Sequence, residues 1–92
     1  KSHLDFLEYA IKVKDFDQWL KAYDTEVASQ RLEYGLIDEV VARGIDDKNL
    51  VHLVFLISDI DKAKKMMSSK KIKKRMREQG VTVMPTFEYY TR

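Results

Sequence analysis

Residues 50–57 read Leu-Val-His-Leu-Val-Phe-Leu-Ile, and this stretch decides the fold. Side chains alternate between the two faces of a strand, so one face of this strand carries Val51, Leu53, Phe55 and Ile57. The other face carries Leu50, His52, Val54 and Leu56. Because neither face is polar, a strand here has to be covered on both sides. We expect helices to cover one side and a further layer of protein to cover the other.

The composition is that of one globular domain, which we assign to residues 1–92, since 45% of the residues are hydrophobic and 35% are charged. A domain of this length buries only about two thirds of its unfolded surface, so dimerisation would stabilise it. The absence of cysteine excludes disulfides, thiolate metal sites and cysteine nucleophiles. It fits a reducing compartment, and we expect a cytoplasmic protein. No apolar run approaches the roughly 18 residues of a membrane span.

A strand and a helix are predicted before the central stretch. Residues 6–13 alternate, with Leu7, Tyr9, Ile11 and Val13 on the apolar face. Asp15 is a typical helix N-cap with Gln18 three residues later. The apolar stripe that follows has helical spacing and consists of Phe16, Trp19, Leu20, Tyr23 and Val27. We predict a helix to about residue 33, ended by Gly35.

The remaining elements follow from charge, turn residues and periodicity. Residues 36–43 carry charge on both faces and are predicted as an edge strand, joined to the central strand by a turn over residues 44–49. Ser58 is the expected cap of a second helix, broken near Ser68 and Ser69 and closed by Gly80. Residues 81–91 are predicted as the last strand, with Val83, Pro85, Phe87 and Tyr89 on one face. This strand should lie at an edge or be irregular, because Pro85 lacks a hydrogen-bond donor.

The predicted order is strand, helix, strand, strand, helix, strand. Right-handed crossovers and the hairpin favour an antiparallel sheet in the order 4-1-3-2, with the helices on one face. This is the ferredoxin-like α+β arrangement, and it places residues 50–57 at the centre of the sheet. Such a fold hosts many functions, so particular residues have to decide among them.

Missing residues disfavour three of those functions. The central strand lacks the aromatic run of an RNA-recognition motif. A metal chaperone would need paired thiolates. An acylphosphatase needs an arginine in the loop after the first strand, where this chain has Lys14, Asp15 and Asp17.

Short motifs along nearly the whole chain point to one family when their order and spacing are taken together. They are residues 13–19 (Val-Lys-Asp-Phe-Asp-Gln-Trp), Arg31, Gly35, Arg43, residues 46–49 (Asp-Asp-Lys-Asn), Ser58, Asp59, Lys62, Ala63, Ser69, Met76, Gly80, Val81 and Pro85. In these motifs the chain resembles the dimeric α/β barrel proteins, close to the antibiotic-biosynthesis-monooxygenase type.

The resemblance implies a homodimer in which two ferredoxin-like sheets pack face to face. It also implies a ligand cavity between the sheet and the helices of each subunit. Members of the family include cofactor-free oxygenases of aromatic polyketides, haem-degrading enzymes and isomerases. The haem-degrading relatives resemble each other in an Asn, Trp and His set, whereas this chain has Asn49 in a hairpin and no histidine on either predicted helix. We therefore expect neither haem nor another cofactor.

Five residues are candidates for contact with a small aromatic or apolar ligand: Trp19, Tyr23, Tyr9, His52 and Phe55. Trp19 and Tyr23 could stack on such a ligand, although aromatic stripes at helical spacing usually form core. His52 could shuttle a proton, but a histidine of the core or of an interface is the commoner case. With no second histidine or acid at ligand spacing, we expect no metal site.

Charged residues leave further alternatives open. Arg31 and Arg43 could bind a carboxylate, or could pair at the surface with Glu33, Asp38 or Glu39. Residues 62–77 contain nine Lys and Arg and no acid. Aromatic residues are absent between these cations, so we interpret the run as a solvated helix face and expect no nucleic acid partner.

These observations predict a small-molecule enzyme or binding protein of the cofactor-independent monooxygenase-like type, with a mostly apolar cavity. Such an oxygenase needs a dry cavity and a group that accepts a proton. No catalytic residue can be assigned from the sequence. The alternative is a non-catalytic homodimeric module whose cavity is packed shut.

Overall fold

The computed structural model describes residues 4–26, 31 and 33–92, apart from the side chains of residues 25, 26, 38 and 39. The described elements are, in chain order, β1 (Asp5–Val13), α1 (Phe16–Glu26), β2 (Leu36–Arg43), β3 (Leu50–Ile57), α3 (Ile60–Met67), α4 (Lys70–Glu78), β4 (Val81–Val83) and β5 (Glu88–Thr91). The predicted alternation of strands and helices is confirmed. The predicted continuation of the first helix past residue 26, with Val27 on its buried stripe, crosses residues outside the described ones.

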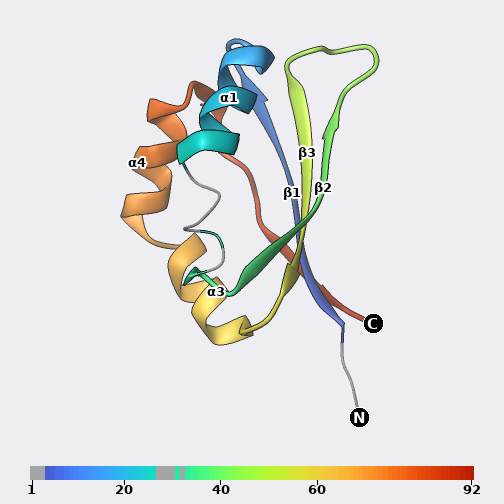
Figure 1. The fold of residues 1–92 in the computed structure, drawn as a ribbon, viewed down its shortest axis with the longest axis vertical. Helices are drawn as coiled ribbons and strands as arrows, with labels where there is room; N and C mark the ends of the chain where they lie inside the picture. The colour runs from blue at the N-terminus through green and yellow to red at the C-terminus, as the bar shows by residue number, and fades with distance from the viewer. Residues whose placement is uncertain (1–3, 27–30, 32) are drawn as a thin grey trace.

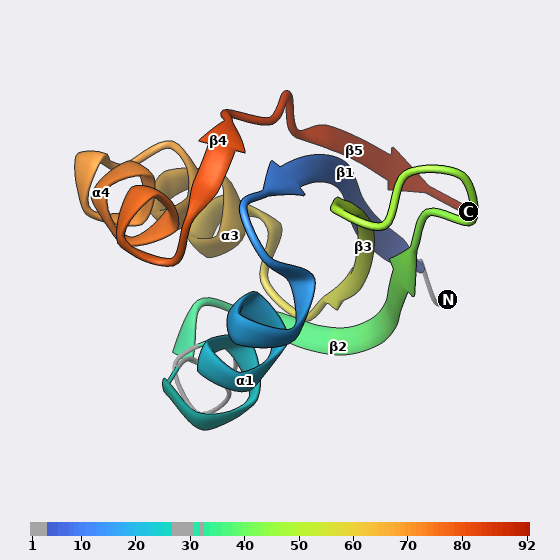
Figure 2. The same cartoon turned by 90° about the horizontal axis from the view of Figure 1, so that it is seen from above.

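The sheet is antiparallel and runs in the order β2-β3-β1-β4, with β5 also paired to β1. The predicted order 4-1-3-2 and the central place of residues 50–57 are therefore confirmed. Figure 1 shows the helices on one side of this sheet, and Figure 2 shows how the sheet curves, with α4 beside β4. The fold is ferredoxin-like, as predicted.

The face of the sheet toward the helices, called here the inner face, carries the core. Residues opposite each other on paired strands share a face, and the pairs Leu7–Phe55, Tyr9–Leu53 and Ile11–Val51 are all buried. The helices cover them with buried side chains from their own apolar stripes, namely Trp19, Tyr23, Ala63, Met67, Ile72 and Met76.

The opposite face of the sheet, called here the outer face, has no helix over it in Figure 1. By register it carries Phe6, Glu8, Ala10, Lys12, Ile37, Val40, Ala42, Leu50, His52, Val54, Leu56, Val83, Glu88 and Tyr90. Ile37 and Val40 are each 43% exposed, and the ring of Phe6 stacks on Tyr90 with centroids 5.3 Å apart. The described part of the chain thus covers one apolar face of the sheet and leaves the other open.

Side-chain caps fix where the helices begin. Asp15 caps α1, as predicted, by accepting the Gln18 N–H at 3.1 Å. The predicted cap of the next helix, Ser58, is wrong by one residue. The Ser58 N–H still donates to Gly35 at the end of the sheet, and Asp59 caps α3 by accepting the Lys62 N–H. The predicted break at the serines is confirmed, since α4 begins after Ser69.

The last strand is two strands, β4 and β5, and not the single strand predicted for residues 81–91. The predicted irregularity around Pro85 is confirmed, because the residues between β4 and β5 form no strand. Because of this interruption, the alternation of side chains between the two faces does not continue from β4 into β5. Val83 is 55% exposed, whereas Phe87 and Tyr89 pack against the core, so the single face predicted for all three is wrong.

Candidate functional site

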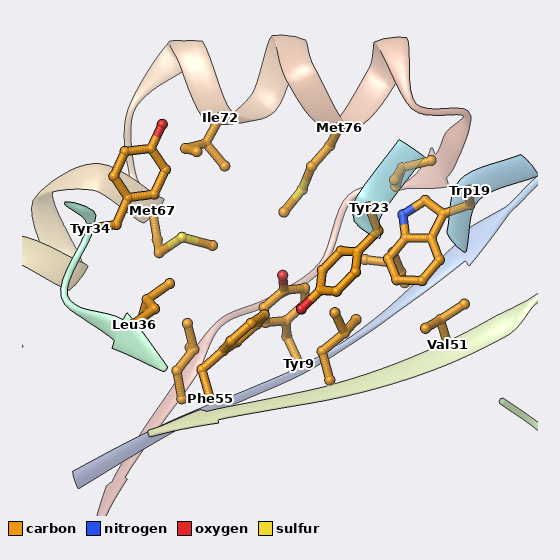
Figure 3. Packing of buried hydrophobic residues seen from close by; sticks show 14 of the residues in the cluster. Tyr9, Trp19, Tyr23, Tyr34, Leu36, Val51, Phe55, Met67, Ile72 and Met76 are labelled. Atoms are coloured by element: carbon orange, nitrogen blue, oxygen red, sulfur yellow. The ribbon is translucent and has the colours of Figure 1, made fainter. Parts of the chain in front are cut away.

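A cavity of about 50 Å³ lies between the inner face and the helices. Its walls come from the sheet, from α1, from the segment before β2, and from α3 and α4 (Figure 3). The lining residues are Tyr9, Ile11, Trp19, Tyr23, Arg31, Tyr34, Leu36, Phe55, Met67, Ile72, Arg75, Met76, Gln79 and Val81.

Trp19 and Tyr23 form the aromatic wall contributed by α1. They are four residues apart, so they lie one above the other on the side of the helix that faces the sheet. Their rings stack with centroids 4.9 Å apart and an interplanar angle of 27°. Both side chains are buried and both line the cavity, so each belongs to the core as well as to the cavity wall.

Tyr9 and Phe55 form the aromatic wall contributed by the sheet. They lie on neighbouring strands, with ring centroids 6.0 Å apart. Phe87 meets the Tyr9 ring edge-on, with ring centroids 4.9 Å apart, so Tyr9 contacts two other aromatic rings. The structure therefore brings four of the five candidate residues to one cavity from three separate elements.

His52 is separated from the other candidates. It lies on the outer face, where its Nε2 is 2.8 Å from Oε2 of Glu8. A side chain on the outer face cannot reach a cavity on the inner face, so His52 does not contribute to this site. Its acidic partner could not be identified from the sequence, because Glu8 and His52 become diagonal neighbours only in the register that pairs Ala10 with His52.

Arg31 lies at the cavity and not at the protein surface. It is 5% exposed, and its guanidinium carbon lies 3.6 Å from the centroid of the Tyr23 ring. Its Nη1 donates to the backbone oxygen of Tyr23 at 3.2 Å. The surface position predicted as one alternative is therefore wrong. The side chains of two of the acids predicted as its partners, residues 38 and 39, lie outside the described residues.

Arg43 has contacts of a different kind. Its Nε donates to the Lys48 oxygen at 2.8 Å, and its guanidinium lies over the Phe16 ring, 4.4 Å from the centroid. It does not line the cavity. The side chains of the acids predicted as its partners, residues 38 and 39, lie outside the described residues.

Arg75 and Gln79 line the cavity and were not predicted from the sequence. Arg75 was assigned to the solvated face of the basic run, and the structure shows it half-buried in the cavity wall. A signal was present, because residues 72, 75, 76 and 79 follow the helical spacing i, i+3, i+4, i+7. Because Arg75 is charged, it was predicted to be exposed and was not counted as part of the buried stripe.

The cavity combines apolar walls with hydrogen-bond donors. The polar groups of the described lining residues are the hydroxyls of three tyrosines, the indole N–H of Trp19, two guanidinium groups and one amide. None of these described residues is Asp or Glu. Elsewhere in the described part of the chain, no three His, Cys, Asp or Glu side chains gather as metal ligands would. Within that same part, no helix has the length and apolar character needed to cross a membrane.

Solved structures of low sequence identity share this fold. A "putative antibiotic biosynthesis monooxygenase" of Caulobacter crescentus matches with a TM-score of 0.66 at 15% identity, over 95% of this chain and 87% of that one. A nipsnap family protein of unknown function from Agrobacterium tumefaciens matches with a TM-score of 0.70 at 11% identity, over 98% and 88%. A dimeric ferredoxin-like protein from an uncultured marine organism matches with a TM-score of 0.56 at 14% identity, over 98% and 86%.

No protein-family model and no curated protein matches the sequence. The chain has the ferredoxin-like fold found in proteins of the antibiotic-biosynthesis-monooxygenase type, as the sequence motifs implied. At these identities the likeness concerns the fold, and the chemistry of the site has to be argued from the cavity itself.

Proposed function

We propose that the protein binds a small aromatic molecule in the cavity beside Trp19 and Tyr23 and acts on it as a cofactor-independent monooxygenase-like enzyme. The observation that carries the proposal is the cavity itself, walled by Trp19, Tyr23, Tyr9 and Phe55. Aromatic walls with a few polar groups are typical of small-molecule sites. The fold shared with proteins of the monooxygenase type supports the reaction class.

The size of the cavity sets a condition on this function. At about 50 Å³ it is smaller than the roughly 150 Å³ of an engineered cavity that holds benzene. An aromatic ring enters only if part of the wall repacks. Met67 and Met76 are in that wall, and methionine is the apolar side chain that adapts most readily to a new shape. Ligand binding is therefore coupled to movement of the side chains of α3 and α4.

A ligand screen tests this proposal. Phenol, catechol and naphthol are expected to raise the melting temperature, whereas cyclohexanol should raise it less, because it cannot stack on Trp19 and Tyr23. The variant Val81→Phe places a ring in the cavity wall and is expected to abolish the shifts while its circular dichroism stays that of the parent. If no aromatic compound raises the melting temperature at millimolar concentration, the proposal is wrong.

We also propose that the working form is a homodimer joined through the outer face. Ile37, Val40 and Tyr90 are 43%, 43% and 45% exposed on that face, which is unusual for so many large apolar side chains on one sheet. A second copy placed face to face would cover them.

A second candidate function is a non-catalytic homodimeric module. The small cavity volume favours it, since 50 Å³ is compatible with a core that admits no ligand. This function predicts a stable dimer whose melting temperature responds to none of the aromatic compounds. The two candidates are thus separated by the same screen.

A further inference from the structure

The described lining residues of the cavity meet solvent at one end of it. All of them are buried except Arg75 and Gln79, which are partly exposed. These two residues are four apart, so they lie one turn apart on the same side of α4, and Gln79 is the C-cap of that helix. Within the part of the chain that the structure describes, the cavity therefore approaches water at the C-terminal end of α4.

A polar cleft of about 400 Å³ opens on the surface at that same end of α4. One side of the polar cleft is lined by Lys14, Asp15, Gln18 and Ala22, and the other side by residues 77–80. Gln79 lines both the polar cleft and the cavity. The two hollows thus meet at this one side chain.

On α1 the cavity and the polar cleft lie on adjacent sides of the helix. Trp19 and Tyr23 line the cavity, and their chain neighbours Gln18 and Ala22 line the polar cleft. Successive residues of a helix point about 100° apart, because one turn holds 3.6 residues. The α1 wall between the two hollows is therefore a single helix, which agrees with their meeting at Gln79.

Hydrogen bonds hold the backbone around Gln79. Its own N–H donates to the Arg75 oxygen at 3.0 Å, and the Gly80 N–H donates to the Arg77 oxygen at 3.0 Å. The Gly80 oxygen accepts the Lys14 N–H at 3.0 Å, which ties the end of α4 to the start of α1. Gly80 has a φ of 86°, which a residue with a side chain would adopt only with strain. A passage at this point thus opens by rotation of the Gln79 side chain, which has several staggered conformations to choose from.

We propose that the polar cleft is the entrance to the cavity and that the Gln79 side chain closes it. This inference rests on the proposed function for the identity of the ligand, and it adds the route of entry and the residue that selects by size. The charged residues of the polar cleft are two cations, Lys14 and Arg77, and two acids, Asp15 and Glu78. Their charges cancel, so the entrance does not repel a neutral aromatic molecule.

Quenching of tryptophan fluorescence by acrylamide tests the entrance without any ligand. Trp19 is the single tryptophan of the chain, is 2% exposed and lines the cavity. In Gln79→Ala the bimolecular quenching constant should rise about threefold, because collision with a buried indole requires an opening. The matched variant Gln18→Ala removes the same atoms from the opposite side of the polar cleft and should leave the constant at the parent value. Loss of stability also raises quenching, so the reverse change, Gln79→Phe, is expected to lower the constant below that of the parent.

Stopped-flow binding of catechol, followed through Trp19 fluorescence, is the second measurement. In Gln79→Ala the association and dissociation rate constants should both rise about fivefold, with the dissociation constant changed less than about twofold. A residue that only contacts the bound ligand would change the dissociation rate and leave the association rate as it is. In Gln18→Ala neither rate constant should change.

The outcomes separate this inference from the function on which it rests. If Gln79→Ala and Gln18→Ala show the same quenching constant, the entrance is wrong and the aromatic cavity stands. An association rate for catechol that is the same in these two variants also overturns the entrance. If quenching changes as expected and no aromatic compound binds, the entrance stands and the proposed function is wrong.

Discussion

Both faces of the sheet carry large apolar side chains, and the two faces differ in what covers them. On β3, Val51, Leu53 and Phe55 are at most 1% exposed, whereas their neighbours of opposite parity face outward. Helices from the same chain cover the inner face. No described helix covers the outer face (Figure 1). A strand that is apolar on both faces therefore indicates that both faces have to be buried. It does not indicate whether the same chain or a second chain buries them.

The polar groups of the two faces differ as well. On the inner face, Arg31 and Arg75 line a cavity between the sheet and the helices, where a charge interacts more strongly than in water. On the outer face, Glu8 and His52 pair within reach of water, with 33% and 46% of their side chains exposed. The chemistry of this protein is thus expected on the inner face and its assembly on the outer face.

The largest expected effect comes from removing a side chain of the inner face. Phe55→Ala should lower the free energy of unfolding by about 3–5 kcal/mol, because a fully buried ring is replaced by a cavity. Val54→Ala changes the next residue, on the outer face, and should cost the isolated subunit about 1 kcal/mol, as expected for two partly buried carbons. Urea denaturation measures both. Equal losses of stability for the two variants would show that the chain buries both faces to the same extent, in contradiction to the exposed outer face.

The next effect concerns the cover of the outer face. Ile37→Lys places a charge where the second subunit is proposed to pack, and an unpaired charge there should cost about 3 kcal/mol or more of association energy. The dimer dissociation constant should rise about 100-fold, measured by sedimentation equilibrium. Ile45→Lys is the matched control, because Ile45 is 96% exposed in the hairpin and should not alter assembly. A parent protein that is monomeric at micromolar concentration would refute the proposed dimer.

A smaller effect is expected from the pair in the middle of the outer face. In the Ile37→Lys background, where the monomer is isolated, Glu8→Gln should cost no more than about 1 kcal/mol, because ion pairs open to solvent contribute little. Glu88 lies directly opposite Glu8 across β1 and β5, so Glu88→Gln should be neutral or slightly stabilising. Thermal unfolding at neutral pH measures both. A loss above 2 kcal/mol for Glu8→Gln would show that the outer face is shielded in the monomer.

The smallest effect is at the rim of the outer face, where Lys12 meets Asp47 at 3.1 Å. The Asn49 N–H, and after it the Lys12 ammonium, hold the pKa of Asp47 below its ordinary value of 3.8. A carboxylate whose pKa is lowered by folding stabilises the protein above its ordinary pKa, and this contribution is lost as the pH falls below 3.8. Asp47→Asn should therefore remove a small part of the acid-induced loss of stability.

Urea denaturation of both proteins between pH 5 and pH 2 is the measurement for Asp47. The difference between them should shrink in 1 M salt, which screens Lys12 and leaves the backbone hydrogen bond of Asn49 in place. Parallel stability curves over this range would contradict the lowered pKa.

Much of the fold could be predicted because its determinants are local. The N-cap at Asp15, the turn over residues 44–49, the break before Ser69 and the interruption at Pro85 all act through neighbouring atoms. Two predictions were wrong. Ser58 does not cap α3, because its N–H still donates to the Gly35 oxygen at the end of the sheet. Val83 does not share a face with Phe87 and Tyr89, because the strand between them is interrupted and the alternation of faces does not continue across the interruption.

The candidate site could be predicted in part. Trp19, Tyr23, Tyr9 and Phe55 follow from the faces of their own elements, since apolar residues of an amphipathic element point to the core. Arg75 was missed because a charged residue is ordinarily exposed, and for the same reason the sequence left a surface position open for Arg31. The Glu8–His52 contact was missed because it depends on which residues of two strands lie side by side.

The sequence by itself determined the elements, their order and the two apolar faces of residues 50–57, because these depend on periodicity and on interactions over a few residues. Only the tertiary structure decided which face the helices cover, how far His52 lies from the aromatic candidates, and which arginines enter the cavity. Those outcomes depend on strand register and on the packing of segments distant in sequence, and no local pattern contains that information.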